Sequence, residues 1–396
     1  MAAIPPTSER LRAQLVAGLR ERGLLGDERI AAAFGRVERH VFVPGHPLKS
    51  AYSDEALVTR ERDGVPASSS SQPAIMAAML AQLDVRAGHR VLEVGAGTGY
   101  NAALLSELAG PGGHVTTIDV DPPTARAAEE HLARAGHGEV RVLAGDGARG
   151  AARDAPFHRI VVTAGCWDIP FAWSEQLAEG GRVVLPLRVN ATELSVALRR
   201  EGETLRGRGA EPCGFMPMQG GEDSTTDWAT TAGWLASADV ALDEEHRAAL
   251  DRLLADPGER VPDWLPRELE RHYDALLWLS LQGRPLVKLV RQDGPGTWAW
   301  RLAVVLPGSL LLITMERRSA RVTDVRRHGT PDALDFMRQA LERWTRAGRP
   351  GRDALRIEAR PVAGPDAGPL PRPVDGGYAF DRGGRRFELR FASGLR

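Results

Sequence analysis

Apolar residues recur at three- and four-residue steps near the start of the chain, which is the periodicity of an amphipathic helix. The pattern covers residues 8–39 and breaks at Gly23–Gly26, so it predicts two helices. A Pro- and Gly-punctuated loop region follows. Another helix is expected from the serines near residue 70 to about Leu83, because Pro73 suits the first turn of a helix.

Short apolar runs then alternate with helical segments. The apolar runs are RVLEVG, HVTTIDV, VRVLAGD, FHRIVVTAG and RVVLPL, and the helical segments between them include YNAALLSELA, PTARAAEEHLARAG and IPFAWSEQLAEGG. This β-α-β order predicts an α/β fold, a doubly wound, Rossmann-like parallel sheet covered by helices on both faces. Such sheets bind their ligands across the carboxyl ends of the strands.

The alternation stops near the polar segment GGEDSTTD. We therefore expect one domain over residues 1–220 and an accessory domain over residues 221–396. Residues 228–275 are expected to be helical, and a further helix is predicted over residues 331–347. The predicted strands of this half are ALLWLSLQ, RPLVKLVRQ, TWAWRLAVVL, SLLLITMERR and ALRIEARPV, followed by the hairpin-like YAFDRGGRRFELRFA. This mixture predicts an α+β accessory domain.

Composition restricts the protein's class and surroundings. The 396 residues are 43% hydrophobic and 26% charged with a formal net charge of −1, as expected for a globular protein of two domains. No 18-residue apolar run and no apolar signal core occur, so we expect no membrane partner and a cytoplasmic location. Cys166 and Cys213 form no CxxC pair, so neither a disulfide framework nor a zinc site is predicted.

The segment VLEVGAGTGYNAALL contains a candidate ligand-binding turn. Gly95, Gly97 and Gly99 stand at alternate positions, and Glu93 precedes the first of them by two residues. A dinucleotide fingerprint is GxGxxG, and Tyr100 stands where its third glycine would fall. ExGxGxG is the usual S-adenosylmethionine (AdoMet) turn of class I methyltransferases, in which glycines let the backbone pass close to the ligand. We expect Glu93 beside the cationic groups of AdoMet and assign Tyr100 to the same site.

Acidic residues also follow the next two predicted strands. Asp119 ends the second strand, where a carboxylate can accept both ribose hydroxyls, and Val120 follows it directly. Asp146 and Gly147 follow the third strand in GDG, where Asp146 can accept from the adenine amino group. Together with the glycine turn, these residues favour AdoMet as the cofactor, with NAD as the alternative ligand.

Several segments resemble protein-L-isoaspartate O-methyltransferases in the same order and at similar spacing. They are ERHVFVPG, AYSDEAL, SSSSQPAIMAAML and VLEVGAGTGYNAALL, and the later segments APFHRIVVTAGCWDIPF and CGFMPMQGG also look like the family. The similarity covers roughly residues 8–220. It implies AdoMet-dependent methylation of an Asp or isoAsp carboxylate in a peptide or protein, which leads to a succinimide (aspartimide) and isoaspartate.

The same resemblance implies roles for individual residues. Ser71 matches the active-site serine and would orient the substrate carboxylate by hydrogen bonding. Ser68, Ser69 and Ser70 fall where the family's backbone wraps the methionine end of AdoMet, although the family usually has Thr-Ile before its active-site serine. Asp54 lies in the stretch that precedes the substrate site. Without the resemblance, the serine run is a polar loop that ends in a helix cap. The nucleophile is a carboxylate that is already ionised at neutral pH, so we expect neither a metal nor a catalytic triad.

The accessory domain extends beyond the resemblance. A C-terminally extended subgroup of the family modifies ribosomally made peptides such as lanthipeptides, graspetides and lasso peptides, which implies an aspartate in a biosynthetic peptide as the substrate. Seven of the nine tryptophans lie in this domain, where they either line a peptide groove or build the second core. Residues 316–396 carry 18 Arg against 11 Asp and Glu, which suits an acidic precursor peptide or else reflects an arginine-biased chain.

Two other functions stay open at this stage. One is repair of isoaspartyl residues in damaged proteins, and the other is that of an inactive AdoMet-binding partner protein. The chain has no lysine cluster and no recognisable DNA- or RNA-binding motif, so nucleic acid is not an expected partner.

Overall fold

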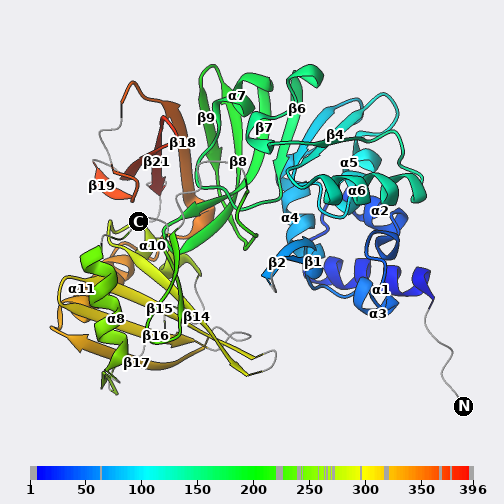
Figure 1. Ribbon diagram of the computed structural model, residues 1–396. Helices are drawn as coiled ribbons and strands as arrows, with labels where there is room; N and C mark the ends of the chain where they lie inside the picture. Colours follow the sequence, from blue (N-terminus) through cyan, green and yellow to red (C-terminus); the bar gives the residue numbers. More distant parts are fainter. Residues whose placement is uncertain are drawn as a thin grey trace, which may run out of the picture. The chain divides into compact units, whose positions relative to one another are not determined.

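The computed structural model describes residues 7–62, 65–219, 226–238, 242, 244–256, 258–262, 264, 266–267, 269, 273–294, 297–315, 321–364, 368–374 and 377–391. The chain forms two compact units (Figure 1). Unit 1 comprises Met1–Pro186, Ser195–Leu205 and Cys213–Glu222, and unit 2 comprises Leu187–Leu194, Arg206–Pro212 and Asp223–Arg396. The predicted boundary at residue 220 falls near the start of the longest segment of unit 2, and two short earlier segments also belong to that unit.

The N-terminal part of unit 1 is helical and leads to a hairpin. Its elements are α1 (Ser8–Glu21), α2 (Glu28–Arg36), the short helix η1 (Arg39–Phe42), α3 (Leu48–Ala51), the antiparallel strands β1 (Leu57–Arg62) and β2 (Val65–Ser70), and α4 (Pro73–Leu83). The predicted pair of helices is confirmed, with Thr7 and Asp27 accepting backbone N–H groups at the two N-termini. Helix α2 packs on α5 of the sheet region (Figure 1).

A parallel sheet forms the rest of unit 1. Its elements are β3 (Arg90–Val94), α5 (Tyr100–Ala109), β4 (His114–Asp119), α6 (Pro122–Arg134), β5 (Arg141–Ala144), β6 (Phe157–Val162), α7 (Phe171–Gln176) and β7 (Leu177–Val189). The strands lie in the order β5-β4-β3-β6-β7, and each neighbouring pair is parallel. The predicted doubly wound α/β fold is confirmed. The chain first builds outward from β3 through β4 to β5 and then returns to β6, so the topological switch point lies between β3 and β6.

The core of unit 1 joins the N-terminal helices to the sheet helices. Phe34, Phe42 and Tyr100 are all buried and meet through their rings, at centroid distances of 6.3 Å for Phe34–Tyr100 and 5.6 Å for Phe42–Tyr100. Burial of one such apolar side chain stabilises the fold by roughly 1.5–3 kcal/mol. The residues on either side of the glycine turn are therefore anchored in a continuous core.

Unit 1 differs from the prediction in one helix boundary and in two strands that were not predicted. The helix predicted over IPFAWSEQLAEGG ends at Gln176, because Leu177 already pairs with Phe157 of β6 and two glycines follow. The sequence-based prediction also missed β8 (Thr192–Glu201) and β9 (Thr204–Arg208), which follow β7 in the sheet order. The alternating residues Leu194, Val196 and Leu198 of β8 are fully buried, which is the strand periodicity that the prediction overlooked.

Unit 2 contains a seven-stranded antiparallel sheet with helices on both faces. Its strands are β11 (Thr226–Ala229), β12 (Leu235–Ala238), β13 (Glu259–Arg260), β14 (Leu286–Gly294), β15 (Thr297–Leu306), β16 (Ser309–Met315) and β17 (Val322–Gly329), in the order β11-β12-β14-β15-β16-β17-β13. Alternate side chains divide between two clusters. Ala303 and Leu310 pack with α8 (Glu244–Ala255), and Leu302 and Leu311 pack with α10 (Tyr273–Ser280) and α11 (Asp332–Arg346).

Four further antiparallel strands complete unit 2. They are β18 (Leu355–Pro361), β19 (Arg372–Val374), β20 (Gly377–Arg382) and β21 (Arg385–Phe391), in the order β19-β20-β21-β18, and β18 lies next to β9 in the same sheet. A two-residue strand, β10 (Glu211–Pro212), lies earlier in the chain. The predicted C-terminal hairpin is β20–β21, and the rings of Phe380 and Phe387 stack across it at 4.9 Å. The predicted α+β character is confirmed.

Two predictions for unit 2 were wrong. The described residues of 228–275 are not mainly helical, because β11, β12 and β13 interrupt them. The segment ALLWLSLQ is helix rather than strand: it falls largely in α10, where Trp278 donates to the carbonyl of Ala340 on α11 at 3.0 Å. An apolar run of this length does not distinguish a strand from a buried helix by periodicity.

The tryptophans whose side chains are described in unit 2 build its core. Trp234 and Trp344 are buried, and Trp264 and Trp278 pack against the cluster beneath α10 and α11. The side chains of Trp228, Trp298 and Trp300 lie outside the described residues. For the four described tryptophans, the core explanation is the one that the structure favours.

Candidate functional site

The backbone of the glycine turn requires glycine. Gly95, Gly97 and Gly99 have φ angles of +101°, +52° and +88°, which side-chain-bearing residues rarely adopt. A Cβ on Gly95 would lie 2.5 Å from the Thr163 hydroxyl oxygen, and one on Gly97 would lie 3.3 Å from the carbonyl oxygen of Ser69. The turn therefore lies directly against the serine segment, residues 68–71, although the two are separated in sequence.

Glu93 lies inside the protein beneath this turn. Its side chain is fully buried, and its two oxygens accept hydrogen bonds from Thr117 at 2.6 Å and from the Asn101 amide at 2.8 Å. Burial raises the pKa of Glu93 to about 7, and the two hydrogen bonds oppose that rise. These hydrogen bonds link β3 to β4 and to the first turn of α5, and the expected contact between Glu93 and a ligand cation stays a prediction.

Asp119 fixes the glycine turn and remains half-buried. Its carboxylate accepts backbone N–H groups from Gly97 at 3.0 Å and from Asp121 at 3.1 Å, and burial raises the pKa of Asp119 above its usual range. Val120 beside it is 38% exposed, an unusual position for a valine. An exposed apolar side chain next to a carboxylate fits a ligand that carries both a planar ring and hydroxyl groups.

Asp146 lies on the same edge of the sheet. Strand register pairs Val94 with Ile118 and Asp119 with Ala144, so the ends of β3, β4 and β5 meet there. Asp146 caps the short helix η2 (Gly147–Arg149) by accepting from the Ala148 N–H at 3.0 Å. The structure thus brings the glycine turn, Asp119 and the start of η2 together at the carboxyl ends of adjacent strands.

Gly147 packs too closely for any side chain. A Cβ there would lie 2.4 Å from Val94 Cγ1, and the Gly147 carbonyl accepts from the indole N–H of the buried Trp173 at 2.8 Å. Sequence analysis missed Trp173 as a support of this loop, because the bond spans 26 residues and follows no periodic pattern.

Tyr100 contributes its ring to the core rather than to the surface of the turn. The side chain is buried against Phe34 and Phe42, and burial raises the pKa of its hydroxyl above the usual range. Any contact between Tyr100 and a ligand would have to come from its backbone N–H, which lies at the start of α5.

The serine segment does not begin the helix as the sequence suggested. Ser68, Ser69 and Ser70 end strand β2, and α4 starts only at Pro73. Ser68 and Ser70 are buried, whereas Ser69 and Ser71 are half-buried, as alternation along an extended chain requires. The Ser70 hydroxyl accepts from Arg39 at 3.4 Å.

Asp54 meets the beginning of α4. One carboxylate oxygen accepts the Ala74 N–H at 2.8 Å, and the other accepts from the Gln72 amide at 3.0 Å and from Arg22 at 2.8 Å. The N-cap residue Gln72 makes no capping bond of its own, so Asp54 supplies the cap from a different segment. These contacts give Asp54 a structural task close to Ser71.

The hairpin that carries the serines is also tied to the sheet region. Arg60 on β1 forms an ion pair with Asp121 at the N-cap of α6 and lies 3.4 Å from the Thr124 hydroxyl. The segment that bears Ser71 is thereby held near the ends of β3 and β4 from a second direction.

Metal and membrane features are absent from the described ranges. No group of three or more His, Cys, Asp and Glu side chains there could hold a metal ion. Among the helices formed by those residues, none is long and apolar enough to cross a membrane.

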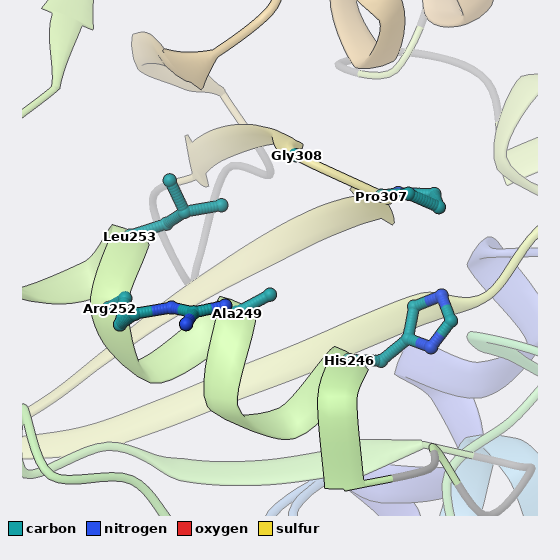
Figure 2. A pocket seen from close by; sticks show the side chains of 6 residues that line it. All are labelled: His246, Ala249, Arg252, Leu253, Pro307 and Gly308. Carbon is teal, nitrogen blue, oxygen red and sulfur yellow. The ribbon is translucent and has the colours of Figure 1, made fainter.

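A separate cavity of about 170 Å³ lies in unit 2. Figure 2 shows its lining: His246, Ala249, Arg252 and Leu253 on α8, facing Pro307 and Gly308 of the turn between β15 and β16. The ionisable lining residues are the basic side chains of His246 and Arg252. This chemistry suits an acidic group and differs from that of the glycine turn.

The comparisons with known proteins agree with the geometry of unit 1. A family model described as protein-L-isoaspartate(D-aspartate) O-methyltransferase (PCMT) matches residues 10–223. The chain belongs to this family. The PCMT family members are AdoMet-dependent carboxyl methyltransferases, so this protein is an enzyme of that class and AdoMet is its methyl donor. The alternative of NAD is therefore not supported.

Individual relatives match about half of this chain over most of their own length. The protein-L-isoaspartate O-methyltransferase of Methanopyrus kandleri is 38% identical over 224 residues, which are 97% of that protein and 56% of this chain. That of Roseiflexus castenholzii is 38% identical over 203 residues, 89% of its length and 51% of this chain. A solved structure titled protein-L-isoaspartate O-methyltransferase matches with a TM-score of 0.52 at 24% identity, covering 88% of this chain and 96% of its own. The fold is therefore shared well beyond the family region.

Proposed function

We propose that this PCMT-family enzyme methylates the free carboxylate of an aspartyl or isoaspartyl residue in a peptide, which is the side-chain carboxylate of aspartate and the α-carboxylate of isoaspartate. The observation that supports this most directly is the contact between the serine segment and the glycine turn, at Ser69 and Gly97. When bound, AdoMet supplies an activated methyl group that a carboxylate oxygen accepts, leaving S-adenosylhomocysteine. The residues assigned to hold AdoMet are those of the turn and of the neighbouring strand ends. They are Ser68, Ser69, Ser70, Ser71, Glu93, Gly95, Gly97, Gly99, Tyr100, Asp119, Val120, Asp146 and Gly147.

The enzyme's own task is alignment. The acceptor carboxylate has an ordinary pKa near 4, so no general base has to ionise it at neutral pH. Correct orientation of two reacting groups can contribute on the order of 7–11 kcal/mol to lowering the barrier. The Ser71 hydroxyl has no hydrogen bond to other described residues, and we assign it to orient the substrate carboxylate.

Methylation prepares the acceptor for ring closure. Methoxide is a better leaving group than oxide, so the following backbone nitrogen can attack the methyl ester, lose methanol and give a succinimide. Hydrolysis of that ring at either carbonyl gives aspartate or isoaspartate. The ring closure requires no further side chain of the enzyme.

We further propose that unit 2 recognises an acidic peptide made for modification. This proposal is supported by the residues that follow the family region, by the arginine surplus of residues 316–396, and by the cavity of His246 and Arg252. A matched pair of variants tests it. Arg252→Ala should raise the KM for the acidic peptide severalfold, and Arg356→Ala, at an exposed arginine outside the cavity, should not. Equal KM values in the two variants would exclude the cavity as a peptide site.

A second candidate is repair of isoaspartyl residues in damaged proteins. It is favoured by the names of the relatives and by the solved structure so titled, whose fold covers most of this chain. Methyl transfer to three peptides distinguishes the candidates: an isoaspartyl peptide, its aspartyl isomer, and the peptide encoded beside this gene. An aspartate-to-asparagine version of the third peptide is the control. Turnover confined to the isoaspartyl peptide would favour repair, and turnover on none of them would refute both substrate assignments.

A further inference from the structure

Arg39 joins the segments around the acceptor side of the site. Its guanidinium is fully buried and donates to the backbone carbonyls of Ala51, Ser53 and Glu55 at 3.0–3.1 Å. It also donates to the carbonyl of Ser71 at 3.0 Å and to that of Ser70 at 3.4 Å. One side chain therefore fixes the loop that carries Asp54 and the end of the serine segment.

These hydrogen bonds hold the buried guanidinium of Arg39 in one position. No carboxylate lies within ion-pair distance of Arg39 among the contacts of the described residues, and burial lowers its pKa. Five carbonyl dipoles take the place of water around its two terminal nitrogens, while Nε has no partner among the described residues, so each bond matters more than it would at the surface. The planar fork of arginine reaches several acceptors at once, which a lysine ammonium does not.

Asp54 completes the arrangement from the other side of Ser71. It accepts from the side-chain amide of Gln72 and from the backbone N–H of Ala74, the first and third residues after Ser71. Ser71 is thus held from two sides: its carbonyl accepts from Arg39, and the residues that follow it donate to Asp54. The Ser70 hydroxyl is committed to Arg39 in the interior, while the half-buried Ser71 hydroxyl makes no bond to the described residues.

We propose that Arg39 and Asp54 are positioning residues that hold the Ser71 hydroxyl toward the acceptor carboxylate. Neither is assigned a contact with substrate, and the inference rests on the proposed role of Ser71. It predicts that removing the contacts of either Arg39 or Asp54 lowers the rate of methyl transfer more than it lowers affinity for the methyl donor. The glycine turn keeps its separate supports from Asp119 and Thr163 in such variants.

The test compares Asp54→Ala, Asp54→Asn and Arg39→Lys with the control Arg22→Gln. Arg22 is an exposed partner of Asp54, and its loss leaves the cap on Ala74 intact. We expect kcat to fall at least tenfold in Asp54→Ala and Arg39→Lys, and affinity for S-adenosylhomocysteine, measured calorimetrically, to fall less than threefold. Asp54→Asn retains an oxygen for the Ala74 N–H and should recover most of kcat. Arg22→Gln should match the parent enzyme.

Hydrogen exchange separates this inference from the proposed function. Exchange at the first turn of α4 should rise in Asp54→Ala and stay at the parental rate in Arg22→Gln, whether or not a substrate is known. Parental exchange and a kcat within twofold of the control would overturn the positioning role. If the parent enzyme methylates no aspartyl or isoaspartyl peptide while exchange responds as expected, the structural role of Asp54 at the start of α4 is supported and the proposed function is refuted. If Asp54→Ala does not fold, Asp54→Asn and Arg39→Lys provide the same comparison.

Discussion

Replacing Glu93 by glutamine should stabilise unit 1 at neutral and alkaline pH. Glu93 is fully buried, and its pKa rises from 4.5, the ordinary value for a glutamate, to about 7. The folded protein therefore binds this proton more tightly than the unfolded chain does. Consequently the carboxyl lowers the free energy of unfolding as pH rises between 4.5 and about 7, and its destabilising effect is complete above that window.

The magnitude follows from the shift. A rise of this size corresponds to about 3 kcal/mol, at 1.36 kcal/mol for each pH unit. Glutamine keeps the shape and stays neutral, and a flipped Asn101 amide can still pair with it, while the Thr117 hydroxyl can rotate. Glu93→Gln should therefore match the parent near pH 4.5 and exceed it by up to about 3 kcal/mol at pH 8.

Native-state hydrogen exchange on peptides from β3 and β4 is the appropriate assay, because it reports the opening of unit 1 without requiring both units to unfold together. The difference in opening free energy between variant and parent isolates the effect of Glu93 from that of other titrating groups. His89 is one of them, since burial lowers its pKa to about 4 and gives it the opposite trend, but it is present in both proteins. A difference that stays constant from pH 4.5 to 8 would refute the reasoning, as would one that shrinks with rising pH.

Three other outcomes are expected. Gly95→Ala should lower the free energy of unfolding by about 2–4 kcal/mol, because a strained φ adds to the loss of the Thr163 hydrogen bond. Gly88→Ala, at φ +79° with open space around it, should lower it by only about 1–2 kcal/mol. Chemical denaturation compares the two variants. Ser71→Ala should lower kcat with little change in S-adenosylhomocysteine affinity, and a large loss of affinity would show that its role is misassigned. Trp173→Phe should cost about 0.5–1.5 kcal/mol in thermal unfolding, because the Gly147 carbonyl loses the indole hydrogen bond and keeps only the one from the Gly150 N–H. A parental melting temperature would count against a stabilising role for the indole bond.

The sequence predicts the parts of the site that depend on local geometry. Alternating glycines, apolar runs of strand length and acidic residues after each run all follow from steric and burial rules that act over a few residues. Those features gave the turn, Asp119 and Asp146 at one edge of a parallel sheet. The hairpin β1–β2 escaped prediction because LVTRER and VPASSS show little apolar alternation and are stabilised by their pairing with one another.

Contacts between distant segments decide the remaining assignments. Asp54 caps a helix that starts 19 residues later, and Arg39 reaches Ser71 across 32 residues, so no periodic pattern reveals either contact. The position of Glu93 in the fold could partly have been predicted from the sequence. A central strand of a parallel sheet is buried on both faces, so the burial of a glutamate between Leu92 and Val94 could have been expected.

The burial of Glu93 has a consequence for catalysis. The acceptor carboxylate is ionised well below neutrality, and the site has been assigned no general base, so neither gives the reaction an inflection near pH 7. Glu93 does titrate there, beneath the turn assigned to the cationic methyl donor, and a negative charge at that position favours a cation. The value of kcat/KM for AdoMet should therefore rise through about pH 7 in the parent enzyme and be flat in Glu93→Gln. An inflection that survives in the variant would mean that another group controls donor binding.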